Sequence, residues 1–232
     1  MSCWDGFGNL ADGRPFWVGD FSGSGKSEVL FYFPGDGNWW LGTHNGNDLA
    51  WDFVGNTGRP YDSSVRLHVK LLAQPTAFTI DQMVTGMREV YASANVRLDV
   101  GSTETLSIAD ADIEVGDCVR GQTTQEQRNL FDNRNNVGTN DVVAYVTRTV
   151  TSNGRSLNGC AAHDGRPSCV VARAATQWTL AHEVGHVLGL SHVVNTDQLM
   201  TGGGTANITN PPPDILEAER LTMDSSPLTR AC

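Results

Sequence analysis

Basic residues and long apolar runs are both scarce in this chain. Its 16 lysines and arginines stand against 26 aspartates and glutamates, which gives a formal net charge of -10. No basic stripe is available to neutralise phosphates, so the sequence excludes general nucleic-acid binding. No apolar run approaches the roughly 18 residues that a membrane-spanning helix needs, so a transmembrane helix is excluded as well. Neutral or cationic partners fit this charge better.

A visible secretion signal and any Cys-x-x-Cys pair are also missing. The first residues, Met1 to Asp5, include neither a basic nor an apolar region, so a signal was either removed or never existed. The absence of Cys-x-x-Cys disfavours a thioredoxin-like or zinc-ribbon protein. With 39% hydrophobic residues over 232 positions, the chain is long enough for one large domain or two small ones.

The five cysteines predict a location outside the reducing cytosol. Four of them follow residue 62 and allow two disulfides in three possible pairings, with free thiols as the alternative. We favour Cys160 with Cys169, because only a short hairpin-like stretch separates them, and Cys118 with Cys232 by elimination. Cys3 is then unpaired. The chain is therefore predicted to be secreted.

Tryptophan is almost absent after residue 62, where only Trp178 remains of six. Short apolar runs before that point are separated by turn residues, which predicts four antiparallel strands near residues 15–20, 28–33, 38–42 and 49–54. Residues 1–62 are thus predicted to form a small all-β module, and residues 63–232 a second domain. A sheet this small should pack against the rest of the chain or against a partner.

A glycine-containing loop in the first module has oxygen-bearing side chains at alternate positions. This spacing suits a calcium ion and gives the candidate ligands Asp20, Ser22, Ser24, Lys26 and Glu28. Two serines stand where carboxylates would bind better, and a plain loop is the alternative. Together with residues 35–40, the loop resembles one blade of the FG-GAP (VCBS-type) repeats. That resemblance implies a small β module, often concerned with calcium or adhesion.

The second domain reads as a mixture of helices and strands, so the fold class is α+β. Residues 65–71 alternate as a half-buried strand, and the capping-box pair Thr79 and Gln82 starts an amphipathic helix. A helix and an Asn-rich loop are expected within residues 123–140. A terminal helix should follow Asp214 as N-cap. Further strands are expected at residues 95–100, 141–150 and 169–172.

The segment from Thr176 to His192 carries the chemistry. On a helix capped by Thr176, His182 and His186 are four residues apart and project from one face, where both imidazoles can bind one metal ion. Gly189 falls where the helix should end, because glycine adopts the left-handed conformation that turns the chain. That turn would bring His192 back as a third ligand.

Three histidine ligands leave one position of a tetrahedral zinc ion open for water, which is the arrangement of a catalytic site. The metal lowers the pKa of that water, and Glu183, next to the first histidine, is placed to accept its proton. The predicted reaction is amide hydrolysis without a covalent intermediate. His44, His68 and His163 have no comparable context and are interpreted as surface or packing residues.

The pattern His182-Glu183-x-x-His186-x-x-Gly189-x-x-His192 resembles the metzincin clan of zinc endopeptidases. The resemblance implies a twisted mixed sheet, an active-site helix and a small C-terminal subdomain with a terminal helix. It also implies a methionine turn, with Met200 as a hydrophobic floor under the histidines and not as a ligand. Val193 and Gly202 match none of the markers of the matrixin, astacin, adamalysin and serralysin groups, so the group stays open.

The sequence therefore predicts a secreted zinc metalloendopeptidase whose substrate lies extended along a sheet edge, for which residues 156–163 are the candidate. The first module is predicted to be accessory; zinc-blocking latency through Cys3 or Asp20 is the alternative. Two further alternatives are an adhesion module with a non-catalytic zinc site and a peptidase acting on cell-wall peptides. The oligomeric state is not readable.

Overall fold

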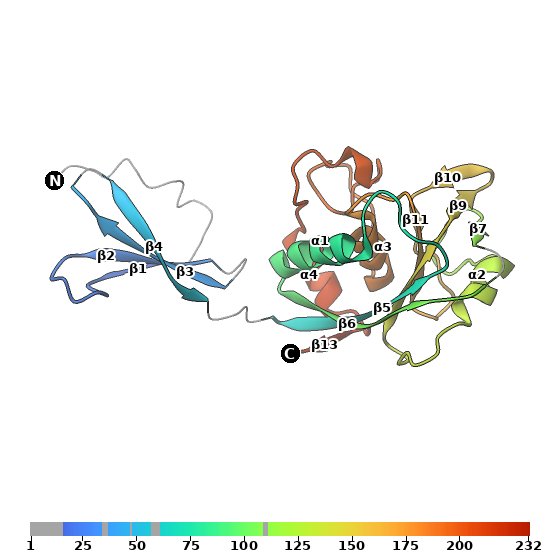
Figure 1. Ribbon diagram of the computed structural model, residues 1–232, viewed down its shortest axis with the longest axis horizontal. Helices are drawn as coiled ribbons and strands as arrows, with labels where there is room; N and C mark the ends of the chain where they lie inside the picture. The colour runs from blue at the N-terminus through green and yellow to red at the C-terminus, as the bar shows by residue number, and fades with distance from the viewer. Residues whose placement is uncertain (1–15, 34–36, 47, 57–60, 109–110) are drawn as a thin grey trace. The chain divides into compact units, whose positions relative to one another are not determined.

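Contacts along the chain separate it into two units, Met1–Pro60 and Tyr61–Cys232. The computed structural model describes residues 16–33, 37–46, 48–56, 61–108 and 111–232 (Figure 1). Cys3, the candidate latency residue, lies outside the described residues. No helix in the described ranges is both long enough and apolar enough to cross a bilayer.

The first unit contains a four-stranded antiparallel sheet in which each strand pairs with the next along the chain. Its strands are β1 (Phe16–Gly19), β2 (Glu28–Phe33), β3 (Asn38–His44) and β4 (Leu49–Asn56). Aromatic rings meet across neighbouring strands, as in the pair Tyr32 on β2 and Trp39 on β3, whose ring centroids are 4.7 Å apart. The ring of Trp51 lies over Gly42, where a Cβ atom would come within 2.7 Å of it. The absence of a side chain at Gly42 therefore makes room for this ring.

The candidate calcium loop between β1 and β2 uses its carboxylates to hold its own backbone. The Glu28 carboxylate accepts hydrogen bonds from the amides of Phe21 and Ser22, at 2.9 and 2.8 Å. Asp20 accepts one from the amide of Gly25 at 2.8 Å. These bonds close the loop without a cation, so the structure gives the calcium prediction no support.

The second unit is built on a six-stranded mixed sheet. Strands β6, β5, β8 and β12 are parallel; β11 lies antiparallel at the edge beside β12, and β13 pairs antiparallel with the start of β5. A smaller sheet has the order β10-β9-β7. The strands are β5 (Ser63–Leu71), β6 (Val96–Thr105), β7 (Asp112–Glu114), β8 (Val142–Thr147), β9 (Thr149–Ser152), β10 (Arg155–Leu157), β11 (Gly159–Cys160), β12 (Ser168–Ala172) and β13 (Thr229–Ala231).

The single strand predicted for residues 141–150 is in fact two strands that belong to different sheets. The break falls at Arg148, whose amide donates to the Ala111 carbonyl at 2.8 Å and whose guanidinium binds Asp112. These contacts turn the chain from the large sheet at β8 into the small sheet at β9.

In the part of the chain that the structure describes, four α-helices accompany the sheets, with a short 3-10 turn, η2 (Thr205–Asn207), near the C-terminal end. The helices are α1 (Ile80–Ser93), α2 (Gln125–Phe131), α3 (Thr179–Leu188) and α4 (Glu217–Asp224). The predicted capping box of α1 is confirmed, because Thr79 and Gln82 exchange backbone-to-side-chain bonds of 2.8 and 3.2 Å.

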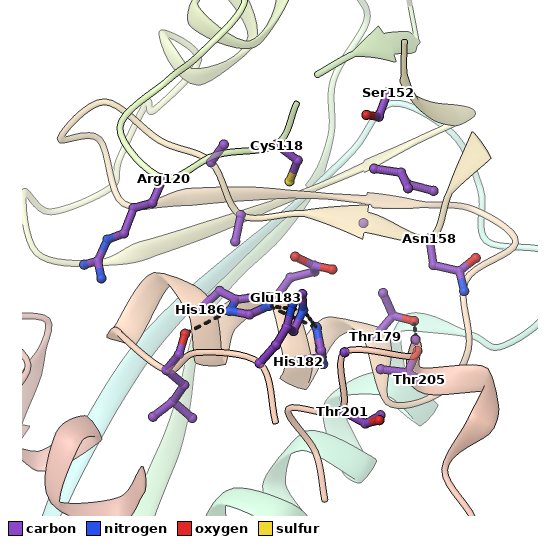
Figure 2. Close-up of a pocket in the computed structure, with 18 of the residues that line it drawn as sticks. Cys118, Arg120, Ser152, Asn158, Thr179, His182, Glu183, His186, Thr201 and Thr205 are labelled. Carbon is purple, nitrogen blue, oxygen red and sulfur yellow. Dashed lines mark hydrogen bonds between the residues drawn. The ribbon is translucent and has the colours of Figure 1, made fainter. Parts of the chain in front are cut away.

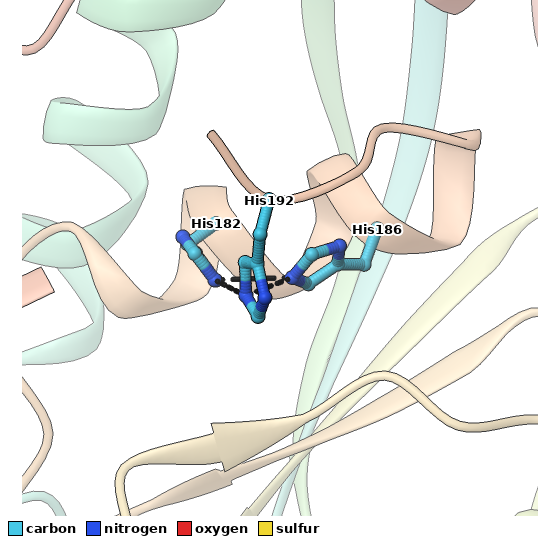
Figure 3. A group of neighbouring side chains, drawn as sticks. All are labelled: His182, His186 and His192. Carbon is cyan, nitrogen blue, oxygen red and sulfur yellow. Dashed lines mark hydrogen bonds between the residues drawn. The ribbon is translucent and has the colours of Figure 1, made fainter. Parts of the chain in front are cut away.

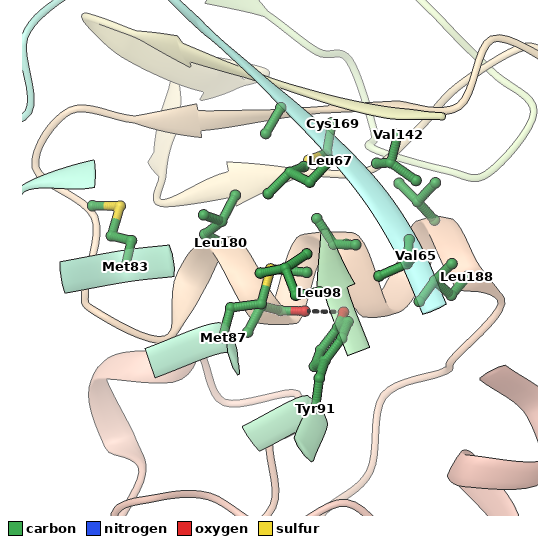
Figure 4. Packing of buried hydrophobic residues seen from close by; sticks show 14 of the residues in the cluster. Val65, Leu67, Met83, Met87, Tyr91, Leu98, Val142, Cys169, Leu180 and Leu188 are labelled. Atoms are coloured by element: carbon green, nitrogen blue, oxygen red, sulfur yellow. Dashed lines mark hydrogen bonds between the residues drawn. The ribbon is translucent and has the colours of Figure 1, made fainter. Parts of the chain in front are cut away.

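Both faces of the large sheet are covered, and β8 is buried along its whole length. Its residues Val142, Ala144 and Val146 join a core that includes α1 and α3, whereas Val143 and Tyr145 join a core that includes α2. In the first core the Tyr91 hydroxyl donates to the carbonyl of Ala181 at 2.9 Å and thereby ties α1 to α3 (Figure 4).

The predicted disulfide pairs are wrong. The bond joins Cys118 to Cys160, with a Cα–Cα distance of 5.9 Å, while Cys169 is a buried free thiol and Cys232 an exposed one. Cys160 on β11 lies opposite Val170 on β12, so the neighbouring Cys169 points to the other face of the sheet. Cys160 accordingly joins the α2 core and Cys169 the α1 and α3 core.

Two predicted helix caps are also wrong. Helix α3 starts at Thr179 after Trp178, which makes no side-chain cap, and the Thr176 hydroxyl instead bonds the hydroxyls of Thr179 and Thr205 at 3.0 and 2.7 Å. Asp214 does not cap α4, because its backbone is held extended: its amide donates to Asp197 and its carbonyl accepts from Leu199, both at 2.9 Å.

Candidate metal centre

Helix α3 and the turn that follows it bring three histidines together. His182 and His186 are one helical turn apart, and their Nε2 atoms are 3.1 Å apart. Gly189 ends the helix with a φ of 114°, a conformation that favours glycine, and the chain turns back. The Nε2 atom of His192 then lies 3.3 Å from that of His182 and 3.0 Å from that of His186 (Figure 3).

The hydrogen bonds of the outer ring nitrogens fix which nitrogen carries the lone pair. Nδ1 of His182 donates to the carbonyl of Leu199 at 2.7 Å, and Nδ1 of His186 donates to that of Leu190 at 2.9 Å. The Nε2 atoms of these two rings therefore point lone pairs at the same spot, an arrangement that is unfavourable unless a cation lies between them. Ligands of a tetrahedral zinc ion are about 3.3 Å apart, so the spacing fits zinc.

Burial sets the protonation of these groups in the metal-free chain. Loss of hydration lowers the pKa of His182 to about 4 and also lowers that of His186, so both are neutral ligands at pH 7. The same loss raises the pKa of Glu183 to about 8. A carboxyl group with a perturbed pKa beside three converging imidazoles is typical of a catalytic centre.

Glu183 is held between α3 and the edge strand. A Cβ atom at Gly159 on β11 would lie 2.6 Å from both Cγ and Oε1 of Glu183, so only glycine leaves room for this carboxyl group. Figure 2 shows Glu183 rising from the helix toward the strand, above the histidines.

Met200 lies directly against the active-site helix. It is fully buried, and a Cβ atom at Gly185 would come within 2.8 Å of its sulfur. The turn that carries it is tied to the third histidine's neighbour: the Val193 amide donates to the Met200 carbonyl, and the Gly202 amide to the Val193 carbonyl, both at 2.9 Å. That Met200 forms a floor under the histidines and is not a ligand stays a prediction.

A cleft of about 680 Å³ opens over the histidines, between α3 and the segment that includes β11. Sequence reasoning missed several residues that line it, among them Arg120, Thr179 and Thr205, whereas Asn158 and Gly159 belong to the predicted substrate edge. Arg120 lies two residues after Cys118, and only the Cys118–Cys160 disulfide, which the sequence prediction did not contain, shows that this loop is close to the edge strand. Ser156, Ala161 and Ala162, from the predicted substrate edge, also line the cleft.

The other candidate residues do not join this centre. Within the described ranges, His182, His186 and His192 are the group of acidic, histidine or cysteine residues that converge closely enough to hold a metal ion. His68 is a buried packing residue, with Nδ1 at 2.8 Å from Ser102 Oγ and Nε2 at 3.3 Å from Asp141. His163 is largely buried, and neither ring nitrogen has a partner among the described residues.

The profile of the metallopeptidase family M12B, reprolysin-like, matches residues 73–214. The chain belongs to this family. The matched range, which is more than half of the chain, contains the three histidines, Glu183 and Met200. This reprolysin-like chain is therefore a zinc metallopeptidase, an assignment that the histidine geometry supports independently.

Solved structures similar to this reprolysin-like chain include a metalloproteinase and an archaemetzincin. Metalloproteinase-II from Bacteroides fragilis has a TM-score of 0.52 at 11% identity, over 85% of this chain and 75% of that one. Archaemetzincin from Methanopyrus kandleri has a TM-score of 0.49 at 19% identity, over 69% of this chain and 93% of that one. The first likeness supports a metallopeptidase fold and nothing finer. No curated protein has a significantly similar sequence.

Proposed function

We propose that the chain is a secreted zinc metalloendopeptidase of the metzincin type. The observation that carries this proposal is the convergence of three Nε2 atoms within 3.3 Å of one another, beside the buried Glu183 and at the floor of an open cleft. A structural zinc site is closed by a fourth protein ligand, whereas three ligands in a cleft leave a position for the reacting groups.

Metal binding and proton transfer are assigned to different residues of the chain. His182, His186 and His192 would hold the ion, which when bound supplies a Lewis acid that activates water and polarises the scissile carbonyl. Glu183 accepts the proton of the attacking water and delivers it to the leaving amine. Gly159 on one side and α3 on the other hold this carboxyl group in place.

The edge strand is positioned to bind an extended substrate. The carbonyl of Asn158 accepts from the Ala172 amide at 2.8 Å and so points into the sheet. Across a trans peptide, the next amide points the opposite way, so the N–H of Gly159 faces the cleft. A substrate strand that pairs with this edge would bring its scissile bond over Glu183, because Gly159 contacts that side chain.

Two features support secretion and an accessory role for the first unit. The Cys118–Cys160 disulfide is expected outside reducing compartments. The family match begins at residue 73, beyond the four-stranded sheet of the first unit. We propose that this sheet is an accessory module; latency through Cys3 or Asp20 is the alternative to test.

The test is to assay the full chain and Glu183→Ala on casein and to measure zinc stoichiometry in both. We expect the parent to cleave and the variant to keep one zinc ion without cleaving. If both hold zinc and neither cleaves, Cys3→Ser and Asp20→Ala are assayed next, since relief of latency by either would restore cleavage. Continued inactivity would favour a binding module and contradict the proposal.

A further inference from the structure

One cationic side chain in the cleft has no partner among the described residues. Among the lining residues that the structure describes, Arg120 is the only arginine or lysine, and it forms no hydrogen bond or ion pair with the described parts of the chain. Its side chain extends down from its loop on the side of the cleft where His186 lies, with the guanidinium turned outward from the histidines (Figure 2). An unpaired guanidinium in a binding cleft is available to a carboxylate of the substrate.

The backbone that carries Arg120 is fixed close to the reacting centre. Cys118, two residues earlier, is joined by the disulfide to Cys160 on the edge strand. A turn follows in which the Gln122 amide donates to the Val119 carbonyl at 2.9 Å. At its far end the guanidinium reaches the end of α3, with Nη1 3.9 Å from the position of a Cβ atom at Gly189.

The other charged groups of the cleft do not cancel this charge. Asp117 is engaged with the neighbouring β9–β10 hairpin, where its Oδ1 accepts from Asn153 Nδ2 at 2.7 Å. Glu183 is buried beside the histidines and contacts Gly159 on the opposite wall. The cleft thus offers a guanidinium that no carboxylate of the described residues pairs with, although the whole chain carries a net charge of -10.

The direction of the edge strand tells which part of a substrate meets Arg120. Asn158 lies at one end of the cleft and Arg120 at the other, with Glu183 and the histidines between them (Figure 2). A substrate that pairs antiparallel with β11 runs from the Arg120 end toward the Asn158 end. The residues before the scissile bond therefore pass Arg120.

We propose that Arg120 is a specificity-determining residue that binds an aspartate or glutamate side chain on the N-terminal side of the scissile bond. This inference rests on the proposed function, because it names the substrate class of the same site. The alternative role of Arg120 is structural: a cation at the C-terminal end of α3 favours the helix dipole whatever the substrate is. The two roles differ in what a substitution does to substrate preference.

The test compares quenched fluorescent peptides that differ only in having Glu, Gln or Lys at the second or third position before the scissile bond. In the parent, kcat/KM should be about tenfold higher for Glu than for Gln, as expected for a charge-assisted hydrogen bond. Arg120→Ala should remove this preference with little change for the Gln peptide, Arg120→Lys should keep part of it, and Arg120→Glu should shift it toward Lys. Arg155→Ala, an exposed arginine outside the lining of the cleft, is the matched control.

A binding measurement separates this inference from the proposed function. In the Glu183→Ala background, anisotropy should show tighter binding of the Glu peptide than of the Gln peptide, and Arg120→Ala should equalise the two. If preference in binding holds but the parent cleaves nothing, the peptidase proposal fails and the role of Arg120 stands. Equal binding of Glu and Gln by the parent, equal losses on both peptides in Arg120→Ala, or an acid preference only after the scissile bond would overturn the inference.

Discussion

At the scale of single residues, the centre combines a buried acid and a buried base whose pKa values move in opposite directions. Burial raises the pKa of Glu183 to about 8 and lowers that of His182 to about 4. In the metal-free protein each shift favours the neutral form and so links folding to pH.

The metal-free protein should lose stability as the pH rises from 6.5 to 8. Folded Glu183 keeps a proton up to about pH 8 that the unfolded chain loses near 4.5, so its contribution is complete below 4.5 and lost as the pH rises to 8. His182 has the opposite effect on stability, but only between pH 4 and 6.5. In that range the unfolded chain carries a proton on this imidazole that the folded chain does not, so stability rises with pH. Above pH 6.5 we therefore expect a loss of about 2 kcal/mol, measured by urea unfolding after chelation of the metal.

Glu183→Gln is the control for this pH effect, because glutamine has no proton to lose. Its unfolding free energy should stay level between pH 6.5 and 8. A loss in the variant as large as in the parent would show that other groups cause the effect.

Single residues were also the scale at which the sequence was most informative. The spacing of His182, His186, Gly189 and His192 predicted a metal group that the structure assembles, because every step of that geometry is local: one helical turn and one glycine turn. Gly159 and Arg120 carried no such signal. Their roles depend on contacts with residues far along the chain, and the spacing of residues in the sequence does not predict such contacts.

At the scale of elements, the contact between the edge strand and the active-site helix decides where the carboxyl group lies. Strand β11 is only two residues long, and its close approach to α3 depends on the missing side chain of Gly159. The sequence predicted residues 156–163 as a substrate edge, but it did not predict the register in which β11 pairs with β12. That register set the correct disulfide, since it points Cys160 and Cys169 to opposite faces.

Gly159→Ala should reduce kcat by roughly 10- to 100-fold without loss of zinc, because the new methyl group would displace the Glu183 carboxyl group. Steady-state kinetics with a zinc measurement checks this. Gly203→Ala is the matched control, since its Cβ atom would meet nothing closer than 3.7 Å and should leave kcat unchanged. An unaltered kcat in Gly159→Ala would contradict the placement of Glu183 against β11.

At the scale of the whole molecule, the net charge of -10 and the local charge of Arg120 have opposite signs. The net charge acts over long distances and is screened by salt, whereas a direct contact to Arg120 is screened far less. Composition alone suggested cationic partners, and it could not show that the cleft also holds a positively charged side chain. Likewise, composition changes near residue 62 suggested two parts of the chain, but not what the first one does.

Salt should therefore change the rate at which charged peptides meet the protein, and it should leave the preference that Arg120 gives for an acidic side chain in place. When the ionic strength rises from about 10 mM to 150 mM, the Debye length falls from roughly 30 Å to 8 Å. We expect kcat/KM to rise for Glu peptides and fall for Lys peptides, with the same slope in the parent and in Arg120→Ala. Stopped assays at four salt concentrations would measure the slope of kcat/KM against ionic strength. If the salt response disappears in Arg120→Ala, the effect comes from the cleft alone and not from the net charge.

The three zinc ligands all come from residues 182–192, whereas Glu183 meets its support from β11 only when the sheet is assembled. Metal capture requires one helix, one turn and the Leu199 carbonyl that orients His182, all within residues 182–199, and such local structure forms early and fast during folding. A chain with an incomplete sheet would already take up zinc and yet hold no positioned carboxyl group. Zinc content therefore reports that helix α3 and the turn after it have formed. Cleavage of a peptide is the measurement that reports a fully folded protein with its sheet assembled.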